Sequence, residues 1–234
     1  MTLSQYPRPV REVHQLELST RCNLRCVYCP HHPVLPRPKE DMSDDIFSAS
    51  LDLVRFFVRQ GTQTELSLTG IGEAMLHPRF VEYATRAREV VGPHRQLTIT
   101  TNGLLLDEQM AAAIAPLRPA VFISLHRPEK AGPAIEIAKR YGIYAGANNS
   151  FATSAFDWAG LQKNWFVSAP KIPCSYLQYG WAVILVDGRV ATCCLDADGS
   201  SAVGTVWDDP ETLMLKPWKS EKEAGCESCH MSIL

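Results

Sequence analysis

Residues 21–30 read RCNLRCVYCP, and the three cysteines of this stretch are Cys22, Cys26 and Cys29. They form a CxxxCxxC pattern on one short segment, so three sulfurs can converge on one inorganic centre. Thiolates are soft ligands that select iron–sulfur clusters or zinc. Structural zinc sites normally have four ligands, and His31 or His32 could supply the fourth, although this spacing is not one of the usual zinc pairs. If the centre is an iron–sulfur cluster with four irons, three cysteine ligands would leave one iron without a protein ligand.

The other cysteines lie late in the chain, and they are Cys174, Cys193, Cys194, Cys226 and Cys229. Two of them end the stretch DGRVATCC at residues 187–194, and two belong to CESC at residues 226–229. Four thiolates can close a metal site completely, and a structural zinc ribbon satisfies that pattern as well as a cluster does. Cys194 is the spare thiol if Cys193 is the ligand, although adjacent cysteines could exchange that role.

The composition limits the possible partners and location. The 234 residues include 23 lysines and arginines and 25 aspartates and glutamates, so no net field would draw the protein to nucleic acid or an anionic membrane. The apolar runs at residues 110–115 and 181–186 are too short to span a bilayer, and the N-terminus has no signal-peptide core. We therefore expect a cytoplasmic protein whose cysteines are reduced.

Strand-like and helix-like segments alternate over the first two thirds of the chain. The expected strands are residues 13–18, 64–68, 96–100, 120–125 and 143–147, with a sixth near 165–168, and the expected helices are 43–59, 79–91, 107–115 and 133–141. Parallel strands joined by helices form an open sheet or a barrel, and both place functional groups after the carboxyl ends of the strands. The chemistry should therefore lie in the post-strand loops at residues 21–30, 69–78, 101–103 and 126–128.

The pattern changes near residue 173. Residues 181–186 and 189–193 read as two strands around Asp187 and Gly188, a strong signal for a type I′ hairpin turn. We expect a main domain over residues 1–170 and a small extension over residues 171–234.

The first cysteine motif resembles the signature of the radical S-adenosylmethionine superfamily, CxxxCxφC, with the aromatic Tyr28 before the last cysteine. The resemblance implies an α/β fold, a partial (βα)6 TIM-like barrel with a small C-terminal β-hairpin-plus-helix extension that binds a cluster. It also implies a [4Fe-4S] cluster on Cys22, Cys26 and Cys29. The open iron would be chelated by S-adenosylmethionine, which is cleaved to a 5′-deoxyadenosyl radical that abstracts a hydrogen atom from the substrate.

The resemblance extends to other post-strand loops. The loop TGIGEAML is similar to the family's GGEP element, in which Gly70 and Gly72 would allow close approach and Glu73 would accept from the ammonium of the cosubstrate. Ala74 departs from that pattern, since the family usually has proline there. Asn102 and Ser124 match positions that face the cosubstrate, although an Asn-Gly turn and a buried hydroxyl would explain them equally well.

The late cysteines resemble the SPASM and twitch extensions of this superfamily, in which a cysteine, a hairpin cysteine and a later CxxC hold an auxiliary [4Fe-4S] cluster. The resemblance implies that its ligands are Cys174, Cys193, Cys226 and Cys229. Cys194 is then either a small buried residue or a catalytic hydrogen-atom donor to a substrate radical.

In architecture the chain resembles the twitch-containing dehydrogenase that oxidises the aminocyclitol 2-deoxy-scyllo-inosamine. This implies dehydrogenation of a small polar substrate, a sugar or cyclitol alcohol, with the auxiliary cluster as electron acceptor and a flavodoxin or ferredoxin as reducing partner. Radical epimerisation through Cys194 and peptide modification are the alternatives among enzymes. A zinc-stabilised binding module is the alternative outside them. A partner nucleic acid or membrane is not expected.

Overall fold

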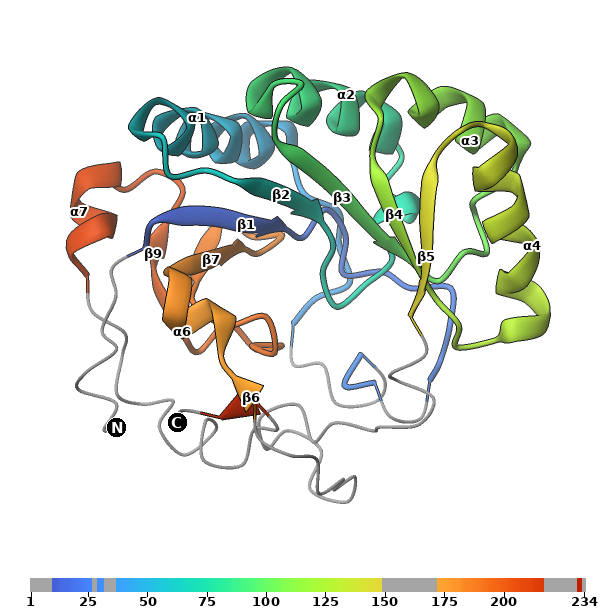
Figure 1. Ribbon diagram of the computed structural model, residues 1–234. Helices are drawn as coiled ribbons and strands as arrows, with labels where there is room; N and C mark the ends of the chain where they lie inside the picture. Colours follow the sequence, from blue (N-terminus) through green and yellow to red (C-terminus); the bar gives the residue numbers. More distant parts are fainter. Residues whose placement is uncertain (1–9, 27–28, 32–36, 149–171, 217–230, 233–234) are drawn as a thin grey trace.

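The computed structural model describes residues 10–26, 29–31, 37–148, 172–216 and 231–232. Its main feature is an eight-stranded sheet of order β5-β4-β3-β2-β1-β7-β8-β9 (Figure 1). The strands are β1 (Glu12–Leu16), β2 (Glu65–Leu68), β3 (Gln96–Thr101), β4 (Ala120–Ser124), β5 (Tyr144–Asn148), β7 (Trp181–Ile184), β8 (Arg189–Ala191) and β9 (Ala202–Thr205). Strands β1 to β5 pair in parallel, which is the expected α/β, partial-barrel architecture.

Helices follow the strands and cover the outer face of the curved sheet (Figure 1). They are α1 (Asp44–Gln60), α2 (Phe80–Val91), α3 (Glu108–Ile114) and α4 (Pro128–Arg140), with two 3-10 turns, η2 (Ala74–Leu76) and η3 (Ala115–Leu117). Helix α1 begins at the N-cap Ser43, whose side chain accepts from the backbone of Ile46, and ends at Gly61 with a φ of 73°. Among the helices of the described residues, none has the length and apolar character needed to cross a bilayer.

The strands alternate between apolar residues toward the helices and polar residues toward the inside of the barrel. In β2, Leu66 and Leu68 are fully buried in the main core, while Glu65 and Ser67 line an inner cavity. Strand β3 repeats this pattern, with Leu97 in the core and Thr98 in the cavity. Because successive side chains point to opposite faces of a strand, each strand contributes one face to the apolar core and the other face to a polar interior.

Helix α4 begins earlier than the sequence predicts. The prediction placed its start at Pro133, but the helix begins at Pro128, and Pro133 lies inside it. Pro128 occupies the first turn, where a missing N–H costs nothing. Ala131 is fully buried against the core, so extending the helix by one turn gains packing that offsets the hydrogen bond lost at Pro133.

The C-terminal part joins the main sheet. Strand β7 pairs in parallel with β1, and β7, β8 and β9 then form an antiparallel meander. A hairpin turn is present at the expected place, but it is not of type I′, because Gly188 has a positive φ of 85° and Asp187 does not. Ala182, Ile184 and Val190 belong to the main core. A division into residues 1–170 and 171–234 stays a prediction, since the two parts share this sheet and its core.

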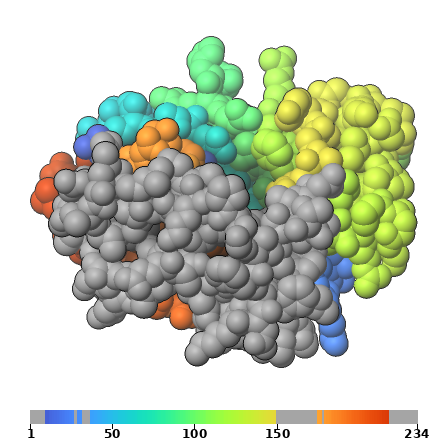
Figure 2. Space-filling model, turned by 60° about the horizontal axis from the view of Figure 1, so that its bottom comes forward, coloured from blue at the N-terminus to red at the C-terminus, as the bar shows by residue number. Residues whose placement is uncertain are grey.

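Three further elements complete the described part of the C-terminal region. They are α6 (Ser175–Tyr179), α7 (Pro210–Leu215) and a two-stranded parallel sheet of β6 (Ile172–Pro173) and β10 (Met231–Ser232). The strand expected near residues 165–168 lies outside the described residues. Figure 2 shows the yellow and yellow-green residues of α4 and β5 on one side of the molecule and the red residues of α7 on the other.

Candidate active site

The first cysteine loop is closed by hydrogen bonds between its start and its end. Thr20 Oγ1 donates to the carbonyl of Pro38 at 2.8 Å and accepts from the backbone N–H of Glu40 at 2.8 Å. Ser19 Oγ donates to Asp41 Oδ1 at 2.7 Å. Ser19 and Thr20 lie shortly before Cys22, and their hydrogen-bond partners lie after the cysteine loop. These hydrogen bonds therefore fix both ends of the loop.

The loop after β2 is pressed against this cysteine loop. A Cβ atom on Gly72 would lie 2.3 Å from the carbonyl oxygen of Ser19 and 2.5 Å from that of Arg21, so only glycine fits there. A Cβ on Gly70 would lie 2.4 Å from Cγ of Glu17. The two glycines therefore allow the loop after β2 to lie in close contact with the end of the first strand and with the cysteine loop.

Glu73 is a buried carboxylate that links three loops. Its backbone N–H donates to the carbonyl of Arg21 at 2.7 Å, and its carboxylate accepts from Thr101 Oγ1 at 2.9 Å and from the backbone N–H of Asn102 at 2.8 Å. Burial raises its pKa, and these hydrogen bonds oppose the rise. A carboxylate so placed in a cavity favours a cationic ligand, whose positive charge would stabilise the ionised form.

Asn102 joins the loop after β3 to the cysteine loop. Its Nδ2 donates to Oδ1 of Asn23 at 2.7 Å and lies 4.0 Å from Sγ of Cys22. Ser124, at the end of β4, is buried and lines the same cavity. The structure thus brings the predicted residues after β1, β2, β3 and β4 together at one end of the sheet.

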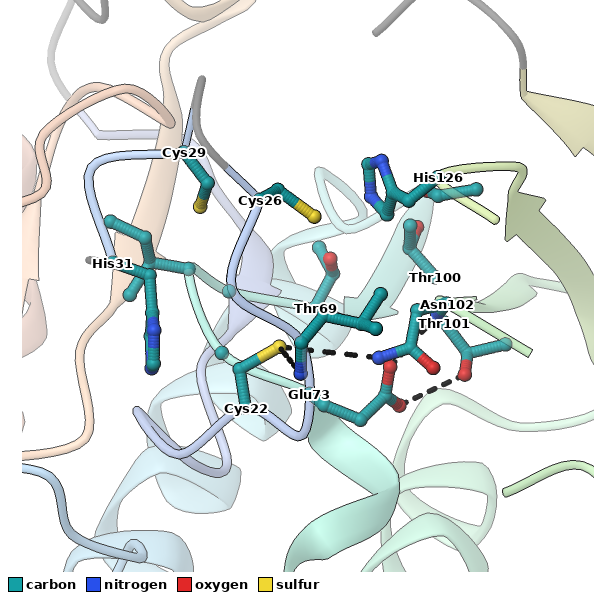
Figure 3. A pocket seen from close by; sticks show the side chains of 15 residues that line it. Cys22, Cys26, Cys29, His31, Thr69, Glu73, Thr100, Thr101, Asn102 and His126 are labelled. Carbon is teal, nitrogen blue, oxygen red and sulfur yellow. Dashed lines mark hydrogen bonds between the residues drawn. The ribbon is translucent and has the colours of Figure 1, made fainter. Parts of the chain in front are cut away.

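These residues surround a cavity of about 130 Å³, shown in Figure 3. Its lining comprises Cys22, Leu24, Cys26, Cys29, His31, Thr69, Gly70, Ile71, Gly72, Glu73, Thr100, Thr101, Asn102, Ser124 and His126. Burial raises the pKa of Cys22, and it raises the pKa of Cys29 to about 11. Thiols in this setting become thiolates when a metal centre supplies positive charge.

The arrangement of sulfurs fits a cluster better than a single ion. Within the described part of the chain, no three histidine, cysteine, aspartate or glutamate residues are grouped closely enough to hold one metal ion. His31, the possible fourth zinc ligand, lines the cavity and has its Nε2 2.7 Å from the carbonyl oxygen of Thr20. His32 and Tyr28 lie outside the described residues. Three cysteines around an open cavity are the donor set that a [4Fe-4S] cluster with one free iron requires.

The late cysteines that the structure describes lie along a second cavity, of about 410 Å³. Cys193 and Cys194 line it, while Cys174 caps α6 and packs with Cys194 against a small core around Tyr176. Burial and the neighbouring cysteines hold the pKa of Tyr176 well above its usual value. Cys226 and Cys229 lie outside the described residues.

The two cavities are adjacent. Thr69, Gly70, Ile71 and Thr100 line both of them. The first cavity holds the early cysteines and the second holds two of the late ones. A molecule between the two cysteine groups would lie inside the barrel, surrounded by the inward residues of the strands.

An internal ion pair, which the sequence did not predict, joins three of these loops. Glu17 follows β1, and both its carboxylate oxygens accept from Arg37 at 2.7 and 2.9 Å. Glu17 also accepts from the backbone N–H groups of Ile71 and Val186, at 3.1 Å each. A charged residue in a strand pattern normally indicates a solvated face. The one feature of the sequence that could have indicated the buried ion pair was a glutamate among apolar neighbours.

Comparison with known proteins identifies the family. The profile of the Radical SAM superfamily matches residues 16–149, which is more than half of the chain and includes the whole first cavity. The chain belongs to the radical SAM superfamily. Membership makes it an enzyme, and it implies a [4Fe-4S] cluster and S-adenosylmethionine as cofactors. The donor set described above fits both.

One relative of this radical SAM enzyme is molybdenum cofactor biosynthesis protein 1 of Bos taurus. The two are 39% identical over 95 residues, which are 39% of this chain and 14% of the relative. The matched residues therefore span only a minor part of that protein's length.

Solved structures share its fold. The crystal structure of BtrN in complex with AdoMet and 2-DOIA has a TM-score of 0.70 at 17% identity, covering 94% of this chain and 92% of that one. Native anSMEcpe with bound AdoMet and Cp18Cys peptide has a TM-score of 0.62 at 16% identity, covering 96% and 84%. These similarities extend over the C-terminal region as well as the barrel.

Proposed function

We propose that this radical SAM enzyme dehydrogenates a small polar molecule, a sugar or cyclitol alcohol. The observation that carries the proposal is the pair of adjacent cavities, lined by the early cysteines on one side and by late cysteines on the other. A substrate between them would be within reach of both a hydrogen-abstracting and an electron-accepting centre. BtrN, which shares the fold, was solved with AdoMet and the small molecule 2-DOIA.

Cys22, Cys26 and Cys29 would hold the first cluster. Glu73 would accept from the ammonium of S-adenosylmethionine, while Asn102, Ser124 and Tyr28 would contact its other parts, next to the loop shaped by Gly70 and Gly72. When bound, these cofactors supply the 5′-deoxyadenosyl radical that removes a hydrogen atom from carbon. The protein's own residues orient the cosubstrate.

Cys174, Cys193, Cys226 and Cys229 would hold a second [4Fe-4S] cluster as electron acceptor. Cys193 and Cys194 both line the inner cavity, so either can serve as the hairpin ligand. A flavodoxin or ferredoxin would supply the reducing electron. The setting would be reducing and cytoplasmic, where cysteines stay available as thiolate ligands.

A radical epimerisation is the second candidate, and the position of Cys194 in the lining of the inner cavity supports it. A thiol there could return a hydrogen atom to a substrate radical. Epimerisation requires Cys194 and places solvent deuterium on a substrate carbon. Dehydrogenation removes two hydrogens, does not require Cys194 as a hydrogen donor, and places no deuterium on the product.

The test is anaerobic reconstitution with iron and sulfide, followed by addition of dithionite and S-adenosylmethionine. We expect 5′-deoxyadenosine from the wild type and none from Cys26→Ala. Incubation with sugars and cyclitols should then give a product lighter by two hydrogens. Deuterium uptake that is lost in Cys194→Ala would favour epimerisation. A protein that takes up only zinc and forms no 5′-deoxyadenosine would refute both reactions and favour a zinc-stabilised binding module.

A further inference from the structure

An extra residue in β1 turns two consecutive side chains into the inner cavity. Val13 pairs with one residue of β7 and Gln15 with the next, so His14 is an insertion in the register. His14 and Gln15 both line the cavity, whereas Val13 and Leu16 on either side are fully buried in the core. Bulges of this kind redirect side chains and are common beside active sites.

The ring of His14 is fixed by its neighbours. It stacks on Trp181, with ring centroids 3.7 Å apart and planes 2° from parallel. Its Nδ1 lies 3.8 Å from Oε1 of Glu12, a buried carboxylate that accepts from Thr64 Oγ1. The opposite nitrogen, Nε2, therefore faces Glu65.

Glu65 presents a carboxylate to the cavity from the start of β2. Its Oε1 lies 4.0 Å from Nε2 of His14 and accepts from Thr98 Oγ1 at 3.2 Å. The side chain is 32% exposed, in contrast to 4% for that of Glu12. The carboxylate thus retains accessible acceptor capacity on a rigid strand.

The other charged groups of this cavity are already engaged. Arg37 is the only lysine or arginine among its described lining residues, and it is bound to Glu17 and to the carbonyl of Ala197 at 2.7 Å. Asp196 accepts from the backbone N–H groups of Ser200 and Ser201. Glu65, flanked by His14 and Thr98, is therefore the most accessible charged group of this cavity, and it is a carboxylate.

We propose that Glu65, positioned beside His14, binds a protonated amine of the substrate. The inference rests on the proposed function because it takes the inner cavity as the substrate site. The remaining polar lining would bind substrate hydroxyls through Gln15, Ser67, Thr98, Thr100 and Asn148. The substrate class is a small polar molecule that carries an amine and no phosphate, because no uncommitted guanidinium or ammonium among the described lining residues would neutralise a phosphate.

The test measures binding of three similar probes, glucosamine, glucose and glucose 6-phosphate, to the anaerobically reconstituted full chain with S-adenosylmethionine. Ligand-observed NMR gives each Kd. We expect glucosamine to bind at least about tenfold more tightly than glucose, and glucose 6-phosphate more weakly than either. Glu65→Gln keeps the side chain's shape and should abolish the preference for the amine, while glucose binding changes less than about twofold. Glu89→Gln, the same change on the exposed surface of α2, should leave all three constants unaltered.

Equal binding of the three probes to the wild type, or binding of none, would overturn the inference, as would a Glu65→Gln variant that retains the amine preference. Thermal unfolding of both variants checks that they are folded. The proposed function has a separate readout: 5′-deoxyadenosine formation without an amine preference refutes only the role of Glu65, and its absence from a cluster-loaded enzyme given a substrate candidate refutes the radical reaction.

Discussion

The guanidinium of Arg37 lies against the carboxylate of Glu17 in the interior of the protein, with side chains only 5% and 2% exposed. Glu17 follows the first strand, and Arg37 comes from the far side of the cysteine loop. Through Ile71 and Val186 the same carboxylate contacts the loop after β2 and the segment after β7. One carboxylate therefore sets the mutual position of the loops around both cavities.

We predict that Arg37→Met destabilises the protein by about 3 to 5 kcal/mol, because it leaves Glu17 buried without its counter-charge. Chemical denaturation measures the free energy of unfolding. Adding Glu17→Gln to Arg37→Met should recover part of the lost stability, since the double variant has no unpaired charge. A double variant no more stable than Arg37→Met would contradict this account.

Gly72→Ala should disrupt the cysteine loop, because the added methyl group would meet backbone oxygens at 2.3 and 2.5 Å. We expect reduced iron content after reconstitution and a lower melting temperature. Gly132→Ala is the matched control: it lies inside α4 with nothing beyond its chain neighbours within 4 Å of the added carbon, and it should leave the iron content unchanged. Equal effects of the two variants would argue against the close contact at Gly72.

Asn102→Ala removes the donor to Asn23 and the acceptor for the backbone N–H of Leu104. We expect a loss of about 1 to 3 kcal/mol from two hydrogen bonds. Release of the segment around Cys22 should also make iron loss to a chelator faster than in the wild type. Chelation kinetics unchanged from those of the wild type would show that this contact does not hold the loop.

His126 lines the first cavity, and burial lowers its pKa below the usual 6.5. The unfolded chain therefore binds a proton more readily than the folded one. The free energy of unfolding should fall as pH decreases from about 7 through the folded-state pKa. In the cofactor-free protein, His126→Gln should show a smaller decrease over this range in denaturation curves recorded at several pH values. Parallel curves for the two proteins would contradict the prediction.

The order of strands and helices could be predicted because it depends on local patterns. Helix α1 has an N-cap at Ser43 and an apolar stripe, and its observed bounds differ from the predicted ones by one residue at each end. The Asp187-Gly188 turn could be predicted for the same reason. The candidate site followed from the family signature, and the structure places its described members around one cavity.

The remaining features depend on contacts between residues far apart in sequence. Pairing of β7 with β1 joins segments about 170 residues apart, and no local pattern encodes it. The inserted His14 is visible only as a shift in that pairing. Sequence patterns also did not predict β9, because its strand is short and includes Gly204.

Because β7 lies along β1, the first strand has hydrogen-bonded neighbours on both sides. A truncated protein lacking residues 171–234 would expose the N–H and C=O groups of β1 as a free strand edge, next to the apolar side chains of Val13 and Leu16. Such edges recruit strands from other molecules. The C-terminal region thus also protects the barrel from self-association, so a shortened version should aggregate even where every residue of the first cavity is retained.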